Sequence, residues 1–462
     1  MLPWWSHYFL STLTVLLTLL FVSTILRSKR AAGSTIAWLI VICTVPYLGI
    51  PLYLFLTDRK FKNHWNRKKK LYELPTTPGT GEALPSAERI LLSCGAPPVR
   101  SNSQLDLLPT GEEAWTSIMG LIANAKESIF ITTFIFGDDK VGNAVVDALT
   151  KKAESGIDVR VIVDSLGATL LRHPSFKRLT KAGGKVAYFM PVFHLPFQGR
   201  SNLRNHRKLM VVDREFSVLG GMNLAKEYLG PDNDPKRWVD LGVLIKGESV
   251  TDVHEVFLQD WAYATRAPRP TAHPAKFAPT LTSLKEKLTQ IVASGPDIHG
   301  DPLYDVLLNS IYCARENIWI VTPYFIPDES LTKALDLASK RGVTIHVILP
   351  SHSNHLLADF ARGSFIRELD AAGVRFYLHP KMIHAKAVLM DRSLGILGSA
   401  NFDMRSLLLN YELGLLLYSE ENIDAVEKWV WERQRESALS IPRTGFFREI
   451  LEGVGRVLGP IL

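Results

Sequence analysis

Two short stretches of the sequence carry the same chemically useful side chains at the same spacing. In NHRKLMVVD (205–213) and IHAKAVLMD (383–391), a lysine follows a histidine by two residues and an aspartate follows it by seven. Side chains alternate faces along a strand, so each histidine and its lysine should bring an imidazole and an ammonium to one spot. The two motifs supply the catalytic candidates His206, Lys208, Asp213, His384, Lys386 and Asp391.

Carboxylates in and after the motifs have different expected roles. Asp213 and Asp391 fall on the opposite face of the strand beside a turn, and bracing of a hairpin is favoured for them over contact with substrate. Asp240 in RWVDLGVLI and Glu412 in NYELGLLLY lie on the next predicted strand of each copy. Each carboxylate is expected to orient the imidazole of its own copy, which pairs His206 with Asp240 and His384 with Glu412.

The second strand of each predicted hairpin ends in residues suited to an anionic ligand. Glycine lets the backbone approach a ligand, and amide or hydroxyl groups donate hydrogen bonds to an oxyanion. Together with the lysines, these donors suit a phosphodiester, whose two non-bridging oxygens must be held while charge builds. The predicted phosphate-binding residues are Asn223, Ser399 and Asn401.

Two copies of the motif fit a reaction without a metal or another cofactor. One histidine attacks phosphorus while the other protonates the departing alkoxide and then deprotonates the incoming acceptor. A single histidine–lysine motif arises easily by chance, and a lone histidine is more often structural than catalytic. Both copies continue to glycine and asparagine at the same offsets, which favours the catalytic interpretation.

The motifs lie inside a larger repeat of strand, helix, strand, helix, strand and hairpin. This order predicts an α/β fold in which two similar mixed sheets, covered by helices on both faces, form a pseudo-dimer with one site between them. The segments ANAKESIFITTFIFGDD, ESGIDVRVIVDS and RLTKAGGKVAYF of the first copy match YCARENIWIVTPYFIPDE, KRGVTIHVILPS and IRELDAAGVRFYL of the second.

The N-terminal sequence predicts membrane attachment. Two apolar stretches, His7 to Leu26 and Ser34 to Leu56, contain no charged residue and are each long enough to cross a bilayer. The loop between them has three basic residues and the segment from Arg59 to Lys70 has seven, which places the C-terminal part in the cytoplasm. The same basic run is placed to hold anionic headgroups, or serves only to set the topology.

Composition supports this organisation. The chain has 462 residues, 47% of them hydrophobic, with a net charge of +7 that fits either nucleic acid or an acidic membrane surface. Its three cysteines lack the spacing of a disulfide framework or a zinc site. The predicted parts are a membrane anchor (1–58), a basic and Pro/Gly-rich linker (59–109), a first domain (110–265), a connection (266–296), a second domain (297–440) and an amphipathic tail (441–462) that lies on the bilayer or packs on the protein.

At the paired motifs the sequence resembles the phospholipase D superfamily. The N-terminal apolar pattern and the segments GGMNLAKEYLG, RWVDLGVLIKG, SGPD and GSANFDMRSLLLNYELGLLLY resemble bacterial cardiolipin synthases of that superfamily. The resemblance covers nearly the whole chain. It implies two phospholipase D-like domains and a multi-pass enzyme of the bacterial inner membrane that moves a phosphatidyl group between two phosphatidylglycerols and releases glycerol. By analogy, His206 attacks to form a phosphohistidine and His384 is acid, then base, although the near symmetry of the copies leaves this order open.

Two segments depart from the pattern, PVFHLPFQGRSNLRN (191–205) and SHSNHLLADFARGSF (351–365), where an acidic residue is expected near Asn354. They shape the acceptor pocket or are ordinary loop variation. Alternatives with the same site are a hydrolase or a transferase using another alcohol; a nuclease and an inactive membrane scaffold are further possibilities. The apolar N-terminus favours lipid over nucleic acid, and intact motifs in both copies disfavour the scaffold. Oligomeric state and acyl preference stay open.

Overall fold

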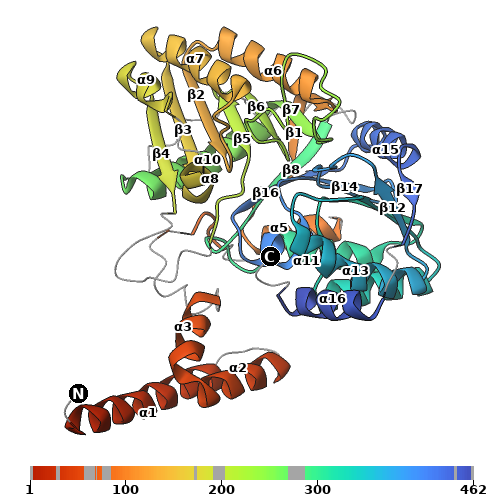
Figure 1. The fold of residues 1–462 in the computed structure, drawn as a ribbon. Helices are drawn as coiled ribbons and strands as arrows, with labels where there is room; N and C mark the ends of the chain where they lie inside the picture. The colour runs from red at the N-terminus through yellow and green to blue at the C-terminus, as the bar shows by residue number, and fades with distance from the viewer. Residues whose placement is uncertain are drawn as a thin grey trace. The chain divides into compact units, whose positions relative to one another are not determined.

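The computed structural model describes residues 4–27, 32–56, 68, 70–74, 85–170, 174–190, 203–268, 287–441 and 445–458. The chain divides into an N-terminal unit, which ends at Arg67, and a larger unit that begins at Lys68 (Figure 1). Most of the basic run between Arg59 and Lys69, the segment 191–202 and the Pro-rich stretch 269–280 lie outside the described residues.

The N-terminal unit consists of α1 (Trp4–Arg27), α2 (Ala32–Thr44) and α3 (Pro46–Leu56). The second apolar stretch, predicted as one span, is interrupted at Val45, because a proline at position 46 disfavours helical geometry in the residue before it. Ile25, Ile42 and Tyr53 form a small core between the helices. In the part of the chain that the structure describes, no helix is both long and apolar enough to span a membrane, so the predicted transmembrane helices are not confirmed.

The larger unit is built on one mixed sheet of 15 strands within the described residues. In the first half, β2 (Ser128–Thr133), β3 (Asp158–Asp164) and β4 (Lys185–Phe189) are parallel, and β5 (Leu209–Val212), β6 (Phe216–Gly220) and β7 (Gly242–Gly247) continue the sheet antiparallel. The second half repeats this order with β9 (Asn317–Val321), β11 (Thr344–Pro350), β12 (Arg375–His379), β13 (Ala387–Met390), β14 (Leu394–Gly398) and β16 (Glu412–Leu417). The predicted duplication of a mixed α/β unit is confirmed, but the two halves form one continuous sheet and not two separate sheets.

Two strands that the sequence analysis left outside the domains join the halves. β1 (Arg100–Leu108) pairs with β7, β8 (Lys287–Ser294) pairs with β16, and β1 and β8 pair with each other across the middle of the sheet. The predicted linker and connection therefore extend too far. RSNSQLDLL carries polar residues at exposed or half-buried positions such as Ser103 and Asp106, and this weakens the apolar signal of a strand.

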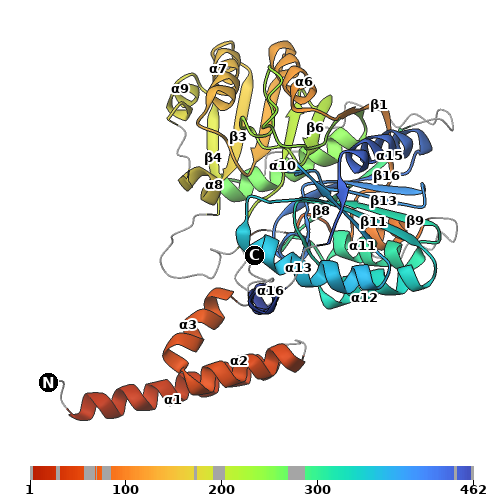
Figure 2. The same cartoon turned by 45° about the vertical axis from the view of Figure 1, so that its right-hand side comes forward.

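Helices cover the outer face of each half, and two further helices lie in a layer between the halves (Figures 1 and 2). α10 (Ser249–Thr265) and α15 (Glu420–Arg435) belong to one apolar core that both halves line. The outer faces form two separate cores. The helices of the first half are α6 (Gly111–Asn124), α7 (Lys140–Glu154), α8 (Ser165–Leu170) and α9 (Phe176–Lys181); with the second half lie α5 (Ser86–Ser93), α11 (Pro302–Cys313), α12 (Glu329–Lys340), α13 (Leu356–Ala371) and α14 (Met404–Leu408).

The remaining elements also belong to the second half. β10 (Phe325–Ile326) pairs with β15 (Phe402–Asp403), and β17 (Ala438–Leu439) pairs with β12. The tail forms α16 (Phe446–Leu458), which packs on α13 through Glu452, whose carboxylate pairs with Arg367. Ile450 and Leu451 stay half exposed, so α16 packs on the protein and still presents apolar side chains to its surroundings.

Candidate active site

The two motifs meet because each half pairs its backbone with the other at the residues that flank the histidines. Asn205 forms a parallel bridge with Tyr411, and Val239 forms one with Ile383. The amide of His206 donates to the carbonyl of Tyr411 at 2.9 Å, and the amide of His384 donates to that of Val239 at 2.6 Å. Both histidines and lysines therefore lie just before β5 and β13, and the strands begin after the lysines.

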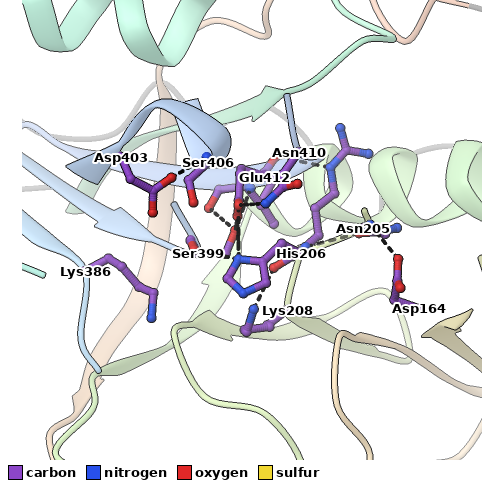
Figure 3. A network of polar contacts seen from close by, with 12 residues as sticks. Asp164, Asn205, His206, Lys208, Lys386, Ser399, Asp403, Ser406, Asn410 and Glu412 are labelled. Atoms are coloured by element: carbon purple, nitrogen blue, oxygen red, sulfur yellow. Dashed lines mark hydrogen bonds and ion pairs between the residues drawn. The ribbon is translucent and has the colours of Figure 1, made fainter. Parts of the chain in front are cut away.

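This pairing exchanges the carboxylates between the halves, which corrects the predicted pairs. His206 Nδ1 lies 3.0 Å from Glu412 Oε1, and His384 Nδ1 lies 2.7 Å from Asp240 Oδ2 (Figure 3 for the first pair). Both carboxylates are fully buried. A carboxylate only accepts, so each neutral imidazole carries its proton on Nδ1 and keeps the lone pair of Nε2 for chemistry.

Asp213 and Asp391 do not belong to the catalytic set. Asp213 accepts hydrogen bonds from the amides of residues 126–128, and Asp391 accepts from those of residues 315–317, at 2.7 to 2.9 Å. These amides begin or precede β2 and β9. The two aspartates thus fasten the turn of each hairpin to the neighbouring strand, which is the bracing role that the strand alternation favoured.

The two lysines lie in the same site as the histidines. Lys208 Nζ donates to the carbonyl of His206 at 2.8 Å, and Lys386 Nζ lies 3.0 Å from His384 Nε2. The charge of Lys386 acts on His206 and that of Lys208 acts on His384, so the site is electrostatically shared by both halves. Figure 3 shows Lys208 below the His206 ring and Lys386 to its left.

Burial favours the uncharged forms of both the imidazoles and the lysines in the empty site. Burial lowers the pKa of His206, against the raising effect of Glu412. It lowers the pKa of His384 to about 3, aided by Lys386 and opposed by Asp240. Burial also lowers the pKa of Lys208 to about 7 and that of Lys386 to about 8. A bound anion would offset this loss of solvation, so the site is built for a negatively charged ligand.

The three predicted phosphate-binding residues differ in the hydrogen bonds that their side chains already make. The hydroxyl of Ser399 donates to Glu412, and its carbonyl lies 3.1 Å from His206 Nδ1, so its one O–H is committed to positioning this pair. Asn223 Oδ1 accepts from the amide of Ile135 at 3.1 Å. Asn401 is buried beside Asp403, and among the described residues its Oδ1 accepts no hydrogen bond. Phosphate binding by Asn223 and Asn401 stays a prediction.

Aromatic side chains around the histidines were missed. The ring of Tyr228 meets that of His384 edge-on at 5.0 Å between centroids, and Trp238 lies 5.6 Å from it. Phe134 meets His206 edge-on at 5.2 Å. Tyr228 and Trp238 stand in the distinctive segments GGMNLAKEYLG and RWVDLGVLIKG, which was the available signal. Near these residues, as throughout the described ranges, no three His, Cys, Asp or Glu side chains form a group that could hold a metal.

Two fused halves, each with a histidine and a lysine in one site, define a phospholipase D-like fold. A family model described as cardiolipin synthase, PLD-like domain, matches residues 118–261 and 307–433, and one described as phospholipase D-nuclease N-terminal matches residues 15–56. The chain therefore belongs to the family of cardiolipin synthases with phospholipase D-like domains.

Individual relatives agree with this assignment. The chain is similar to the major cardiolipin synthase ClsA of Bacillus subtilis, with 31% identity over 99% of both chains. It is also similar to a cardiolipin synthase of Geobacillus kaustophilus, with 31% identity over 99% of this chain and 95% of the relative. The phosphatidylserine synthase of Haemophilus influenzae has a similar fold, with a TM-score of 0.64 and 18% identity over 81% of this chain and 99% of that one.

Proposed function

We propose that the chain is a cardiolipin synthase, a phosphatidyltransferase that moves the phosphatidyl group of one phosphatidylglycerol to another and releases glycerol. One observation carries the proposal: two imidazoles, each held by a buried carboxylate of the other half, share a site with two lysines. The family of the chain supplies the substrate class.

The reaction divides into two displacements at phosphorus. In the first, Nε2 of one histidine forms a bond to phosphorus and the bond to the glycerol oxygen breaks, while the other histidine, which takes up a proton at Nε2 once the anionic phosphodiester is bound, gives that proton to the glycerol oxygen. In the second, that histidine takes the proton of the acceptor hydroxyl, whose oxygen displaces the phosphohistidine. Lysine ammonium groups hold the non-bridging oxygens in both steps.

We assign the attack to His206. Its side chain is 14% exposed, whereas that of His384 is 6% exposed and has the ammonium of Lys386 against both ring nitrogens, 2.8 Å from Nδ1 and 3.0 Å from Nε2. A cation at Nε2 suits a group that passes a proton and hinders one that must attack phosphorus. Asn223 and Asn401 complete the set of donors for phosphate, and no metal or other cofactor takes part.

The N-terminal unit is the proposed anchor in the bacterial inner membrane, with the catalytic halves on the cytoplasmic side. Leu16, Leu19 and Leu20 of α1 are each about three-fifths exposed, which suits a lipid environment. Cys313 is exposed on the larger unit, so an impermeant thiol reagent should label it in inverted vesicles and spare it in intact cells. Labelling in intact cells would reverse the proposed topology.

The decisive experiment incubates the purified full chain with radiolabelled phosphatidylglycerol and resolves the products. Cardiolipin and glycerol in equal amounts are expected. Phosphatidic acid would instead indicate a hydrolase, and a new phospholipid formed only with an added alcohol would indicate a different acceptor. Absence of any lipid product, with cleavage of single-stranded DNA, would replace the proposal by a nuclease.

A further inference from the structure

A buried charge cluster stands directly behind the first motif and includes a lysine from the start of the larger unit. The ammonium of Lys68 pairs with the carboxylates of Asp260 and, at 2.8 Å, Asp297. The guanidinium of Arg207, between the catalytic His206 and Lys208, pairs with the same two carboxylates at 2.8 and 3.3 Å. The side chains of all four charged groups are at most 1% exposed.

The cluster reaches the catalytic imidazole along two paths. Asp260 Oδ2 accepts a hydrogen bond from the amide nitrogen of the Asn205 side chain at 3.0 Å, and Asn205 immediately precedes His206. Arg207 Nε donates at 3.1 Å to the backbone carbonyl of Glu412, whose carboxylate holds the imidazole of His206. Figure 3 shows Asn205, His206 and Glu412 as neighbours in one network.

Lys68 is a fixed part of this arrangement. Its ammonium lies 4.4 Å from the ring centre of Tyr411, the residue that bridges Asn205. The next residues of the chain are held against the segment around Asp297. Lys70 Nζ donates to the carbonyl of Ile298 at 2.8 Å, and the amide of Leu71 donates to the backbone carbonyl of Asp297 at 3.0 Å. The hydroxyl of Tyr72 accepts from the amide of Ala293. Lys68 therefore does not face lipid headgroups, which the basic run was predicted to hold; its part in setting the topology stays a prediction.

The charges of the cluster balance only when Lys68 is present. Two carboxylates face two cations, and in a buried site each unpaired charge is costly. The second motif has no counterpart, because Ala385 occupies the position of Arg207. The cluster therefore distinguishes the two halves and serves His206 alone.

We propose that Lys68 is a positioning residue for His206, tying the segment next to the N-terminal unit to the attacking imidazole. The inference rests on the proposed function for the reaction it affects. Without Lys68, two carboxylates face one guanidinium, and one negative charge is left over. This charge would raise the pKa of His206, as Glu412 does, and would work against Lys208 and Lys386, which lower it. Protonated His206 is then favoured, so the acid limb of the reaction moves to higher pH.

The test measures consumption of phosphatidylglycerol into any product, as a function of pH, for full-length variants in detergent or vesicles. Lys68→Met is expected to lower kcat about ten- to hundredfold and to raise the acid limb by up to about one pH unit. Lys68→Arg keeps the charge and should recover most of the rate. The double variant Lys68→Met with Asp297→Asn restores neutrality and should return the acid limb to its wild-type position.

Lys70→Met is the matched control. The ammonium of Lys70 donates to the backbone carbonyls of Pro296 and Ile298, so its loss leaves the carboxylates of the cluster paired. Its pH profile should match that of the wild type. If Lys68→Met keeps the wild-type rate and profile, or if its loss of rate only follows the fraction of folded protein seen by circular dichroism, the inference is overturned. A wild-type chain that consumes no phosphatidylglycerol refutes the proposed function instead, which separates the two failures.

Discussion

Glu412 shows how much a single buried carboxylate does in this site. It accepts from His206 Nδ1 and from the hydroxyl of Ser399, and the amide of Asn410 lies 3.5 Å away. Its negative charge fixes the tautomer of His206 and stabilises the imidazolium whenever the ring holds a second proton.

Glu412→Gln should therefore lower kcat about 10²- to 10⁴-fold, because an amide can present its N–H to Nδ1 and reverse the tautomer. Asp240→Asn is the matched variant for His384, which the exchange of carboxylates predicts to impair the proton-transfer step. Trapping the phosphohistidine after rapid quench distinguishes them: Glu412→Gln should reduce its formation, whereas Asp240→Asn, which impairs proton transfer in both displacements, should slow its turnover as well as its formation. A decrease of less than about threefold in both would contradict the positioning role.

The lysines set the pH range in which the free enzyme captures substrate. Lys208 and Lys386 must be protonated to hold phosphate, and burial lowers their pKa to about 7 and about 8. We expect kcat/KM to fall as pH rises through this range, far below the ordinary lysine value of 10.5. Burial lowers the pKa of both free imidazoles, that of His384 to about 3, so their titration lies on the acid side of this range. The pH dependence of kcat/KM, measured in buffers without competing anions, checks this. A kcat/KM that stays constant up to the ordinary lysine pKa of 10.5 would contradict it.

At the scale of elements, the hairpins position the motifs and the two aspartates hold the hairpins. Asp391 lies in a left-handed turn, with φ of 49°, a geometry that Asp and Asn tolerate better than other residues with a Cβ. Its carboxylate joins the turn between β13 and β14 to three amides around the start of β9.

Asp391→Asn retains the tolerance for this turn and places an N–H against one of the three amides. The free energy of unfolding should fall by about 1–3 kcal/mol, while kcat of the folded protein stays within about twofold. Chemical denaturation alongside kcat measurements tests both parts. A large loss of kcat at full folding would return Asp391 to the catalytic set.

Sequence periodicity was sufficient for much of this level. The repeat order, the two similar mixed halves and the convergence of His206, Lys208, His384 and Lys386 all followed from spacing, but the joining of the halves into one sheet did not. The exchange of Glu412 and Asp240 did not, because alternation along a strand gives the face of a side chain but not which of two equivalent imidazoles lies opposite. The burial of Lys68 could not be foreseen either, since its partners Asp260 and Asp297 are about 200 positions away.

At the scale of the whole molecule, the two halves of one chain complete a single site. β1 and β8 join the halves in one sheet, α10 and α15 share their core, and the bridges at Asn205 and Val239 align the motifs. The acid, the base and the attacking group therefore all come from the same polypeptide.

Mixing His206→Ala with His384→Ala should not restore activity, because each chain keeps a defective site of its own. Each single variant is expected to lose at least about 10³-fold in kcat, since the two histidines act as a unit. Co-expression of differently tagged variants, followed by assay of the doubly purified protein, checks this. Recovery of a substantial share of the wild-type rate would mean that two chains build one site.

The crossed carboxylates also have a consequence for synthesis. A nascent chain that has released only its first half holds His206 before Glu412 has emerged from the ribosome, some two hundred residues later. The imidazole of His206 then lacks the carboxylate that fixes its tautomer. For this reason the unfinished chain should not attack other phosphodiesters in the cell. His206 acquires its carboxylate partner only when the second half has been synthesised and has packed against the first, so the chain should become active only after translation and folding are complete.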